Sequence, residues 1–133
     1  MLKIGDLLGG KYRILSVVGR GGMSTVYLAR NERANKNWAV KEVRKSGVNQ
    51  DQVVEQSLLT EVEIMKHLNN PHLPSIIDVI DIDDTFVIVM DFVEGNSLEK
   101  VLEHGAAPEA QVIDWAKQLC DVLLYLHSCN PPI

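Results

Sequence analysis

The 133-residue sequence is poor in aromatic residues, has only two cysteines, and contains no long apolar run. Cys120 and Cys129 lack the spacing of metal ligands, so we interpret both as reduced thiols without a metal or disulfide role. The longest apolar runs, such as residues 86–90, fall far short of the about 20 residues that cross a bilayer, and the first residues lack the apolar core of a signal peptide. We therefore expect a cytoplasmic protein.

The chain also lacks an excess of positive charge. Thirteen Lys and Arg residues against eighteen Asp and Glu residues give a formal net charge of −5, and no basic stretch is long enough to follow a phosphate backbone. This composition excludes nucleic acid as an expected partner. The length suits one domain with a sizeable core and is too short for two ordinary domains.

The pattern of apolar residues predicts an α+β fold with an antiparallel sheet. After a lead-in over residues 1–11, strands are expected at 12–18, 24–30, 38–43, 76–82 and 86–90. Helices are expected over residues 51–68, over 98–103 with Ser97 as the cap, and from Pro108 in the first turn to about His127. The sheet and its helix would thus occupy the first two thirds of the chain, followed by two further helices.

A glycine-rich stretch between the first two expected strands is the most informative motif. It runs Gly19-Arg20-Gly21-Gly22-Met23-Ser24-Thr25-Val26. Glycine lets the backbone bend where a Cβ would clash, and its bare N–H groups can approach phosphate oxygens. The alternative is an ordinary strand turn. A P-loop is excluded because no Gly-x4-Gly-Lys-Ser/Thr run exists, and a dinucleotide-binding fold would need a helix after the last glycine.

Two charged residues lie at positions where the pattern predicts burial. Lys41 interrupts an apolar strand, and Glu61 lies in the apolar stripe of the helix expected at 51–68. Because an unpaired buried charge costs several kcal/mol, each side chain needs a partner. We expect the ammonium and the carboxylate to pair with each other. The alternative is that both long side chains reach solvent at an edge.

Taken in order, these features resemble the small lobe of a protein kinase. The stretch fits Gly-x-Gly-x-x-Gly-x-Val with Ser24 in place of the third glycine, Ala39-Val40-Lys41 follows on the third strand, and Glu61 on the helix. Gly-Gly-Met at 21–23 is similar to bacterial serine/threonine kinases. The resemblance implies a kinase small lobe at residues 1–90, a hinge at 91–96, and the start of a truncated large lobe at 97–133.

The resemblance also implies a role for each matching residue. The loop from Gly19 to Val26 would cover the ATP phosphates, and Lys41 would hold the α- and β-phosphates while pairing with Glu61. Val26 and Ala39 would lie above the adenine and Leu98 below it. Met90 would be the gatekeeper, and the backbone of Asp91 to Val93 would meet the adenine edge. Plain core packing is the alternative for the apolar positions, and a residue can pack in the core and line the adenine pocket at the same time. The resemblance therefore assigns a cofactor-binding set that consists of Gly19, Arg20, Gly21, Gly22, Met23, Ser24, Val26, Ala39, Lys41, Met90, Asp91, Val93 and Leu98.

The family's next motifs do not occur in these 133 residues. Neither a catalytic loop nor an Asp-Phe-Gly metal site is present, so we assign no ligand for Mg²⁺ and expect the chain by itself to be inactive in phosphate transfer. The parent protein would transfer the γ-phosphate of ATP to protein hydroxyl groups. A non-catalytic regulatory or interaction module is the alternative. Without further large-lobe residues, we expect self-association through the helix at 108–127.

Overall fold

The computed structural model describes the whole chain except residues 23, 46–59, 61 and 83. The described residues form two compact units. The first contains residues 1–68 and 74–93, and the second contains residues 69–73 and 94–133. The predicted lobe and hinge boundaries, at 90/91 and 96/97, stay predictions.

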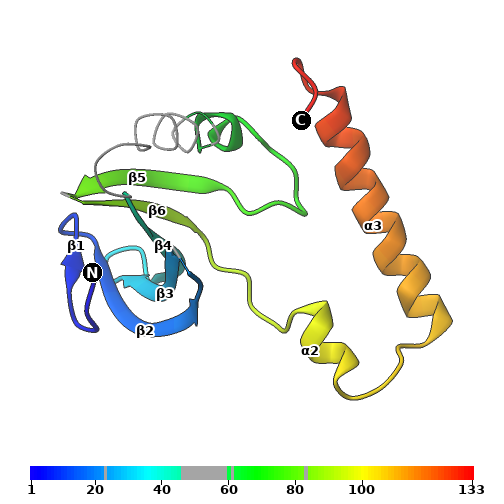
Figure 1. Ribbon diagram of the computed structural model, residues 1–133, viewed down its shortest axis with the longest axis horizontal. Coiled ribbons are helices and arrows are strands. Elements are labelled where there is room, and N and C mark those ends of the chain that lie inside the picture. Colours follow the sequence, from blue (N-terminus) through cyan, green and yellow to red (C-terminus); the bar gives the residue numbers. More distant parts are fainter. Residues whose placement is uncertain (23, 46–59, 61, 83) are drawn as a thin grey trace. The chain divides into compact units, whose positions relative to one another are not determined.

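The first unit is built on an antiparallel sheet that has six strands in the described part of the chain (Figure 1). Its strand order is β1-β2-β3-β4-β6-β5. The bounds are Leu7–Leu8 for β1, Tyr12–Arg20 for β2, Ser24–Asn31 for β3, Lys36–Arg44 for β4, Ile76–Ile82 for β5 and Thr85–Asp91 for β6. The structure thus confirms the α+β fold and the five predicted strands, and it adds β1.

Strand β1 lies within residues 1–11, for which the sequence predicts only a lead-in. Leu7 pairs with Arg13 and Leu8 pairs with Tyr12, so the first residues fold back on β2. A two-residue strand is too short to show an alternating pattern, which is why the sequence did not predict it. Leu8 is buried and joins the hydrophobic core.

The side chains of the sheet alternate between two faces. One face, called the core face below, carries the buried cluster Leu8, Tyr12, Ile14, Tyr27, Ala29, Trp38, Val40, Val87 and Val89. Tyr12 and Trp38 meet edge to face, with ring centroids 6.4 Å apart. β-branched and aromatic residues dominate this cluster, as expected for side chains that pack on a pleated surface.

The other face, called the Lys41 face below, carries the alternate residues. Val26, Ala39 and Lys41 are half-buried there, next to the buried Ile88. The helix predicted at 51–68 is described only in part. Residues 60 and 62–66 are helical, residues 67 and 68 are not, and residues 51–59 and 61 lie outside the described residues.

The second unit contains two helices. Helix α2 spans Leu98–Leu102, and the Ser97 hydroxyl accepts a hydrogen bond of 3.2 Å from the Lys100 N–H, as the predicted cap requires. Helix α3 spans Glu109–Ser128. Pro108 precedes α3 with an extended backbone, so the expectation that it lies inside the first turn is wrong by one residue. No helix among the described residues is long and apolar enough to span a membrane.

Candidate functional site

The glycine-rich stretch forms the turn between β2 and β3. At the end of β2, Gly19 lies opposite Val26 and Arg20 lies opposite Thr25. The Gly21 N–H then donates a hydrogen bond of 2.8 Å to the Ser24 carbonyl oxygen. The predicted hairpin therefore exists. Met23, at the tip of the predicted loop, lies outside the described residues.

The glycines in this turn are not needed for the reason that the sequence suggested. Gly19, Gly21 and Gly22 adopt φ angles that other residues also adopt. A Cβ added at Gly19 or Gly22 would meet no atom within 4 Å, and at Gly21 the nearest atoms are 3.7 Å away. The expectation of an internal clash is therefore wrong. Their exposed, bare backbone leaves room for a ligand that approaches from outside.

Strand register brings four of the predicted site residues onto one face. Val26 on β3 is the direct cross-strand partner of Lys41 on β4, and Ala39 on β4 is the partner of Met90 on β6. All four side chains are half-buried. Lys41 forms no ion pair with any described residue. Glu61, its expected partner, lies outside the described residues, so their pairing stays a prediction.

A cavity of about 180 Å³ lies against the glycine turn on the core face. Arg20, Gly22, Thr25 and Glu42 contribute to its lining. Thr25 and Glu42 are cross-strand partners next to Val26 and Lys41 in the sequence, so their side chains point to the opposite side of the sheet. This cavity is therefore distinct from the space that Lys41 faces.

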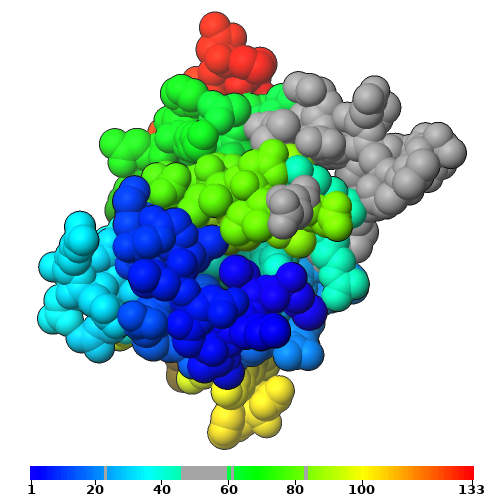
Figure 2. All heavy atoms as spheres, turned by 90° about the vertical axis from the view of Figure 1, so that its left-hand side faces the viewer, coloured from blue at the N-terminus to red at the C-terminus, as the bar shows by residue number. Residues whose placement is uncertain are grey.

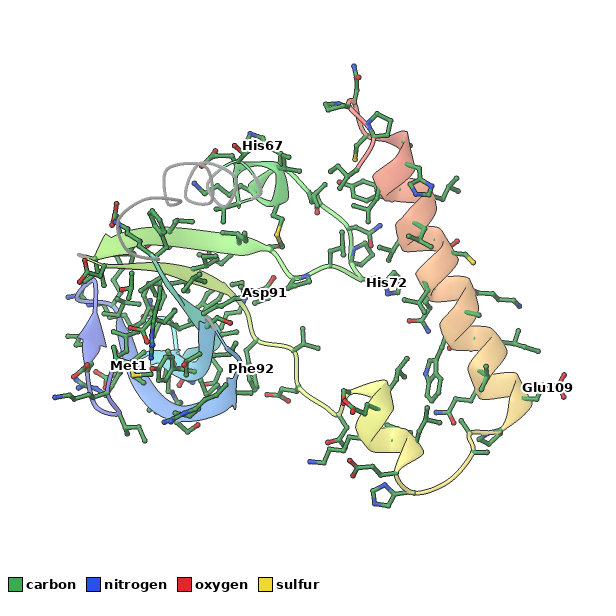
Figure 3. The ribbon with its side chains drawn as sticks, viewed as in Figure 1. Met1, His67, His72, Asp91, Phe92 and Glu109 are labelled. Atoms are coloured by element: carbon green, nitrogen blue, oxygen red, sulfur yellow. The ribbon has the colours of Figure 1, made fainter. Side chains whose placement is uncertain are left out.

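Asp91, labelled in Figure 3, is the last residue of β6. Its side chain contacts Ser75 and Lys36, which belong to two other segments of the first unit. Its carboxylate accepts a hydrogen bond of 3.0 Å from the Ser75 N–H and lies 3.2 Å from the Lys36 ammonium. The backbone hydrogen bond from Ser75 and the charge of Lys36 together hold the pKa of Asp91 below its ordinary value. Its own N–H donates to the Ser75 carbonyl oxygen at 3.0 Å. The side chain of Asp91 thus anchors the end of the strand.

The two residues after Asp91, Phe92 and Val93, follow the end of β6. Neither Phe92 nor Val93 forms a backbone hydrogen bond within the described part of the chain, and the Val93 side chain is 73% exposed. An extended segment whose N–H and C=O groups are unpaired can donate to and accept from a planar heterocycle. The expected contact of the backbone of residues 91–93 with the adenine edge stays a prediction.

Leu98 belongs to the second unit, where it is the first residue of α2. Together with Leu73, Trp115 and Leu119 it lines a cavity of about 300 Å³ within that unit. The expected position of Leu98 below an adenine involves both units and stays a prediction.

Sequence reasoning missed Glu42, the buried carboxylate of the sheet, which is only 4% exposed. Its Oε2 atom accepts a hydrogen bond of 2.9 Å from the Tyr27 hydroxyl, and its Oε1 atom accepts one of 3.0 Å from the Leu2 N–H. The signal was present in the alternation of the strand, because Trp38, Val40 and Glu42 occupy every second position. The described residues contain no cluster of three or more His, Cys, Asp or Glu side chains that could hold a metal ion.

The comparisons with known proteins agree with this geometry. The protein kinase domain family model matches residues 12–131. Myosin light chain kinase A of Dictyostelium discoideum is 32% identical over 120 residues, which are 90% of this chain and 40% of that protein. A probable serine/threonine-protein kinase of Clostridium perfringens is 39% identical over 126 residues, which are 94% of this chain and 18% of that protein.

Another bacterial relative is the serine/threonine-protein kinase PrkC of Bacillus subtilis, which is 30% identical over 94% of this chain and 19% of that protein. The crystal structure of Rad53 1-466 in complex with AMP-PNP superposes with a TM-score of 0.76 at 27% identity, over 89% of this chain and 30% of that one. The chain thus spans well under half the length of the curated relatives named here. These matches confirm the predicted resemblance to bacterial serine/threonine kinases. The chain belongs to the protein kinase domain family.

Proposed function

We propose that this chain is the ATP-binding portion of a serine/threonine protein kinase. The observation that carries the proposal is the pairing of Val26 on β3 with Lys41 on β4, on the half-buried Lys41 face. Met90 lies on the adjacent strand β6, opposite Ala39. A cation without an ion-pair partner among the described residues, beside apolar side chains and next to a glycine turn, suits a nucleotide polyphosphate.

Each part of the proposed site has one task. The exposed backbone at Gly19, Gly21 and Gly22 lets the turn lie close over the phosphates, and the Lys41 ammonium binds the α- and β-phosphates. The backbone of Asp91 to Val93 binds the adenine edge, since Val93 forms no backbone hydrogen bond within the described part. The related Rad53 structure contains AMP-PNP, which is an analogue of ATP, the ligand that we propose for this chain.

Val26, Ala39 and Met90 supply the apolar wall for the adenine ring. They are half-buried rather than fully buried, so part of their surface remains free for a ligand. Covering apolar surface contributes about 25 cal/mol per Å².

The proposed reaction of the full-length parent is transfer of the ATP γ-phosphate to a hydroxyl group of a protein substrate, in the cytoplasm. The residues present fit ATP but not its metal, since the 133 residues contain no Asp-Phe-Gly or catalytic-loop motif to supply Mg²⁺ ligands. Phosphate transfer depends on those ligands and on the catalytic aspartate. We therefore propose that the chain by itself binds nucleotide without transferring phosphate.

A second proposed function is interaction through the exposed apolar face of α3. Leu119 and Leu123, about one turn apart on this face, are 57% and 51% exposed, and no residue of α3 is fully buried. Leaving each large apolar side chain in water costs about 1.5–3 kcal/mol relative to burial. We propose that two copies of the chain associate through residues 108–127, which would cover this face.

The test of nucleotide binding is a thermal shift titration with ATP, with and without Mg²⁺. The wild-type chain should gain a few degrees in Tm at millimolar ATP, with a Kd weaker than about micromolar. Lys41→Ala should abolish the shift without lowering the ligand-free Tm, because Lys41 forms no described ion pair. Lys117→Ala, an exposed lysine of α3, is the matched control and should keep the shift. An equal shift in both variants would contradict the proposed site.

A further inference from the structure

A buried carboxylate joins the N-terminal residues to the two strands that carry the proposed site. Glu42 is 4% exposed and lies on the core face of β4, one residue after Lys41. Its Oε1 atom accepts from the Leu2 N–H at 3.0 Å and lies 3.3 Å from the Met1 amino nitrogen. Its Oε2 atom accepts from the Tyr27 hydroxyl at 2.9 Å. Both oxygens of Glu42 are therefore engaged.

Tyr27 links the same three segments from the side of β3. Its hydroxyl lies 2.9 Å from Glu42 Oε2 and 3.2 Å from the Leu2 carbonyl oxygen. A phenol has one hydrogen to donate. The shorter distance and the negative charge of Glu42 indicate that the Tyr27 hydroxyl donates it to the carboxylate. Burial, followed by the hydrogen bond to Glu42, raises the pKa of Tyr27 above its ordinary value. The hydroxyl thus stays protonated and available as a donor at neutral pH.

The N-terminal residues are held against the sheet at further points. The Gly5 N–H donates to the Ile14 carbonyl oxygen at 2.8 Å, and the Ile14 N–H donates to the Asp6 carbonyl oxygen at 2.9 Å. Leu2 also packs against the core cluster. Figure 2 shows these residues (dark blue) spread over the surface of the first unit. Residues 1–14 therefore form a hairpin, called the N-terminal hairpin below, whose start is bound to Glu42.

We propose that Glu42 is a positioning residue for the nucleotide site, acting through the backbone of β3 and β4. The inference rests on the proposed ATP binding. Glu42 directly follows Lys41 on β4, and Tyr27 directly follows Val26 on β3. Because successive side chains of a strand point to opposite faces of the sheet, Glu42 and Tyr27 lie behind Lys41 and Val26. The hydrogen bonds among Glu42, Tyr27 and the N-terminal hairpin therefore hold, from the back of the sheet, the backbone that presents Lys41 and Val26 at the front.

The chemistry of the carboxylate explains why this contact is more than packing. A buried carboxylate that loses a partner retains its desolvation cost, so the strand must shift to find water or another donor. A shift of about 1 Å in a positioning element can change binding and rate by up to about 100-fold. Strands β3 and β4 have seven other pairs of residues in register besides Thr25 and Glu42, so the sheet itself should persist.

The test compares Glu42→Gln and Tyr27→Phe with the wild-type chain. Tyr27→Phe keeps the ring in the core and removes only the hydroxyl, so it should fold even where the other variant is impaired. Glu32→Gln is the matched control, because Glu32 is an exposed carboxylate that also accepts a short hydrogen bond, from Arg13 at 2.6 Å. Two measurements are made well below Tm: the Kd for ATP, and hydrogen exchange of the backbone amides over residues 24–28 and 38–44.

We expect Glu42→Gln and Tyr27→Phe each to weaken ATP binding by about ten-fold and to speed amide exchange at Val26 and Lys41, with no change in Glu32→Gln. A lower Tm with unchanged Kd and unchanged exchange at these amides would overturn the inference, since a structural role alone would give that result. If the wild-type chain binds no ATP, the proposed function fails, and the inference is then decided by exchange: unchanged exchange at Val26 and Lys41 overturns it.

Discussion

Val26 on β3 and Lys41 on β4 are direct cross-strand partners on the half-buried face of the sheet. Lys41 in turn lies opposite Ile88 on β6. The register of three strands therefore brings an apolar side chain, an ammonium group and a buried isoleucine into one row. This row is close to the glycine turn because Gly19 pairs with Val26.

A larger side chain at Ala39 should block the proposed adenine position. Ala39 is half-buried and lies opposite Met90, so Ala39→Phe would place a ring in the space that the adenine needs. Overfilling of this kind costs about 1–3 kcal/mol, which corresponds to a loss in ATP affinity of about five-fold to about 150-fold. Calorimetric titration measures it. Ala110→Phe on the exposed surface of α3 is the control, and equal affinities in the two variants would contradict the assignment.

The chain by itself should transfer no phosphate. Removal of a catalytic base alone lowers a rate by about 10²- to 10⁴-fold, and the sequence lacks the metal-binding motif as well. Incubation with radiolabelled ATP, Mg²⁺ and a generic protein substrate should give only background incorporation. Incorporation above background that disappears in Lys41→Met would show that this expectation is wrong.

The first unit should lose stability in acid through Asp91. Its pKa is lowered in the fold by the Ser75 N–H and by Lys36, so its contribution is fully present above the unfolded-state pKa and is lost as the pH falls through the lowered folded-state pKa. The loss should therefore appear below about pH 4. Asp91→Asn should show a smaller decrease of Tm between pH 5 and pH 3 than the wild type. Parallel Tm profiles for the two proteins would argue against this contribution.

The core should tolerate Trp38→Phe better than its burial suggests. Trp38 is 8% exposed, and its indole N–H has no partner among the described residues. Phenylalanine loses packing area but also removes a buried donor that costs about 1–3 kcal/mol when unpaired. We expect the free energy of unfolding to change by within about 1 kcal/mol, against about 3–5 kcal/mol for Trp38→Ala. Urea denaturation of both variants tests this, and equal losses would contradict the role of the unpaired N–H.

Self-association should depend on the apolar face of α3. The double variant Leu119→Lys with Leu123→Lys places charges on that face and should remain monomeric at protein concentrations where the wild type associates. Light scattering across a concentration series measures the mass. Gln111→Lys, an exposed polar position of the same helix, should behave as the wild type. A wild-type chain that is monomeric at high concentration would rule out this interface.

Local patterns were sufficient for most elements of the fold. The alternation of residues 12–18 and 86–90, the cap at Ser97 and the apolar periodicity of α3 each report a preference of a short segment, so they were predictable without coordinates. The two-residue β1 was not, because its pairing depends on contact with β2 rather than on its own pattern. The glycine turn was located correctly, although the reason first given for its glycines was wrong.

The sequence by itself determined the family, the order along the chain of the five predicted strands, and the placement of Lys41 in the second strand after the glycine turn, because these depend on residue type and spacing. Only the tertiary structure decided that Val26 and Lys41 share a row, that Asp91 anchors Ser75 and that Glu42 is buried with Tyr27. The physical reason is that strand register and the burial of a charged side chain depend on partners that are distant in the sequence. Leu2 and Glu42, separated by 40 residues, meet only when the sheet has formed.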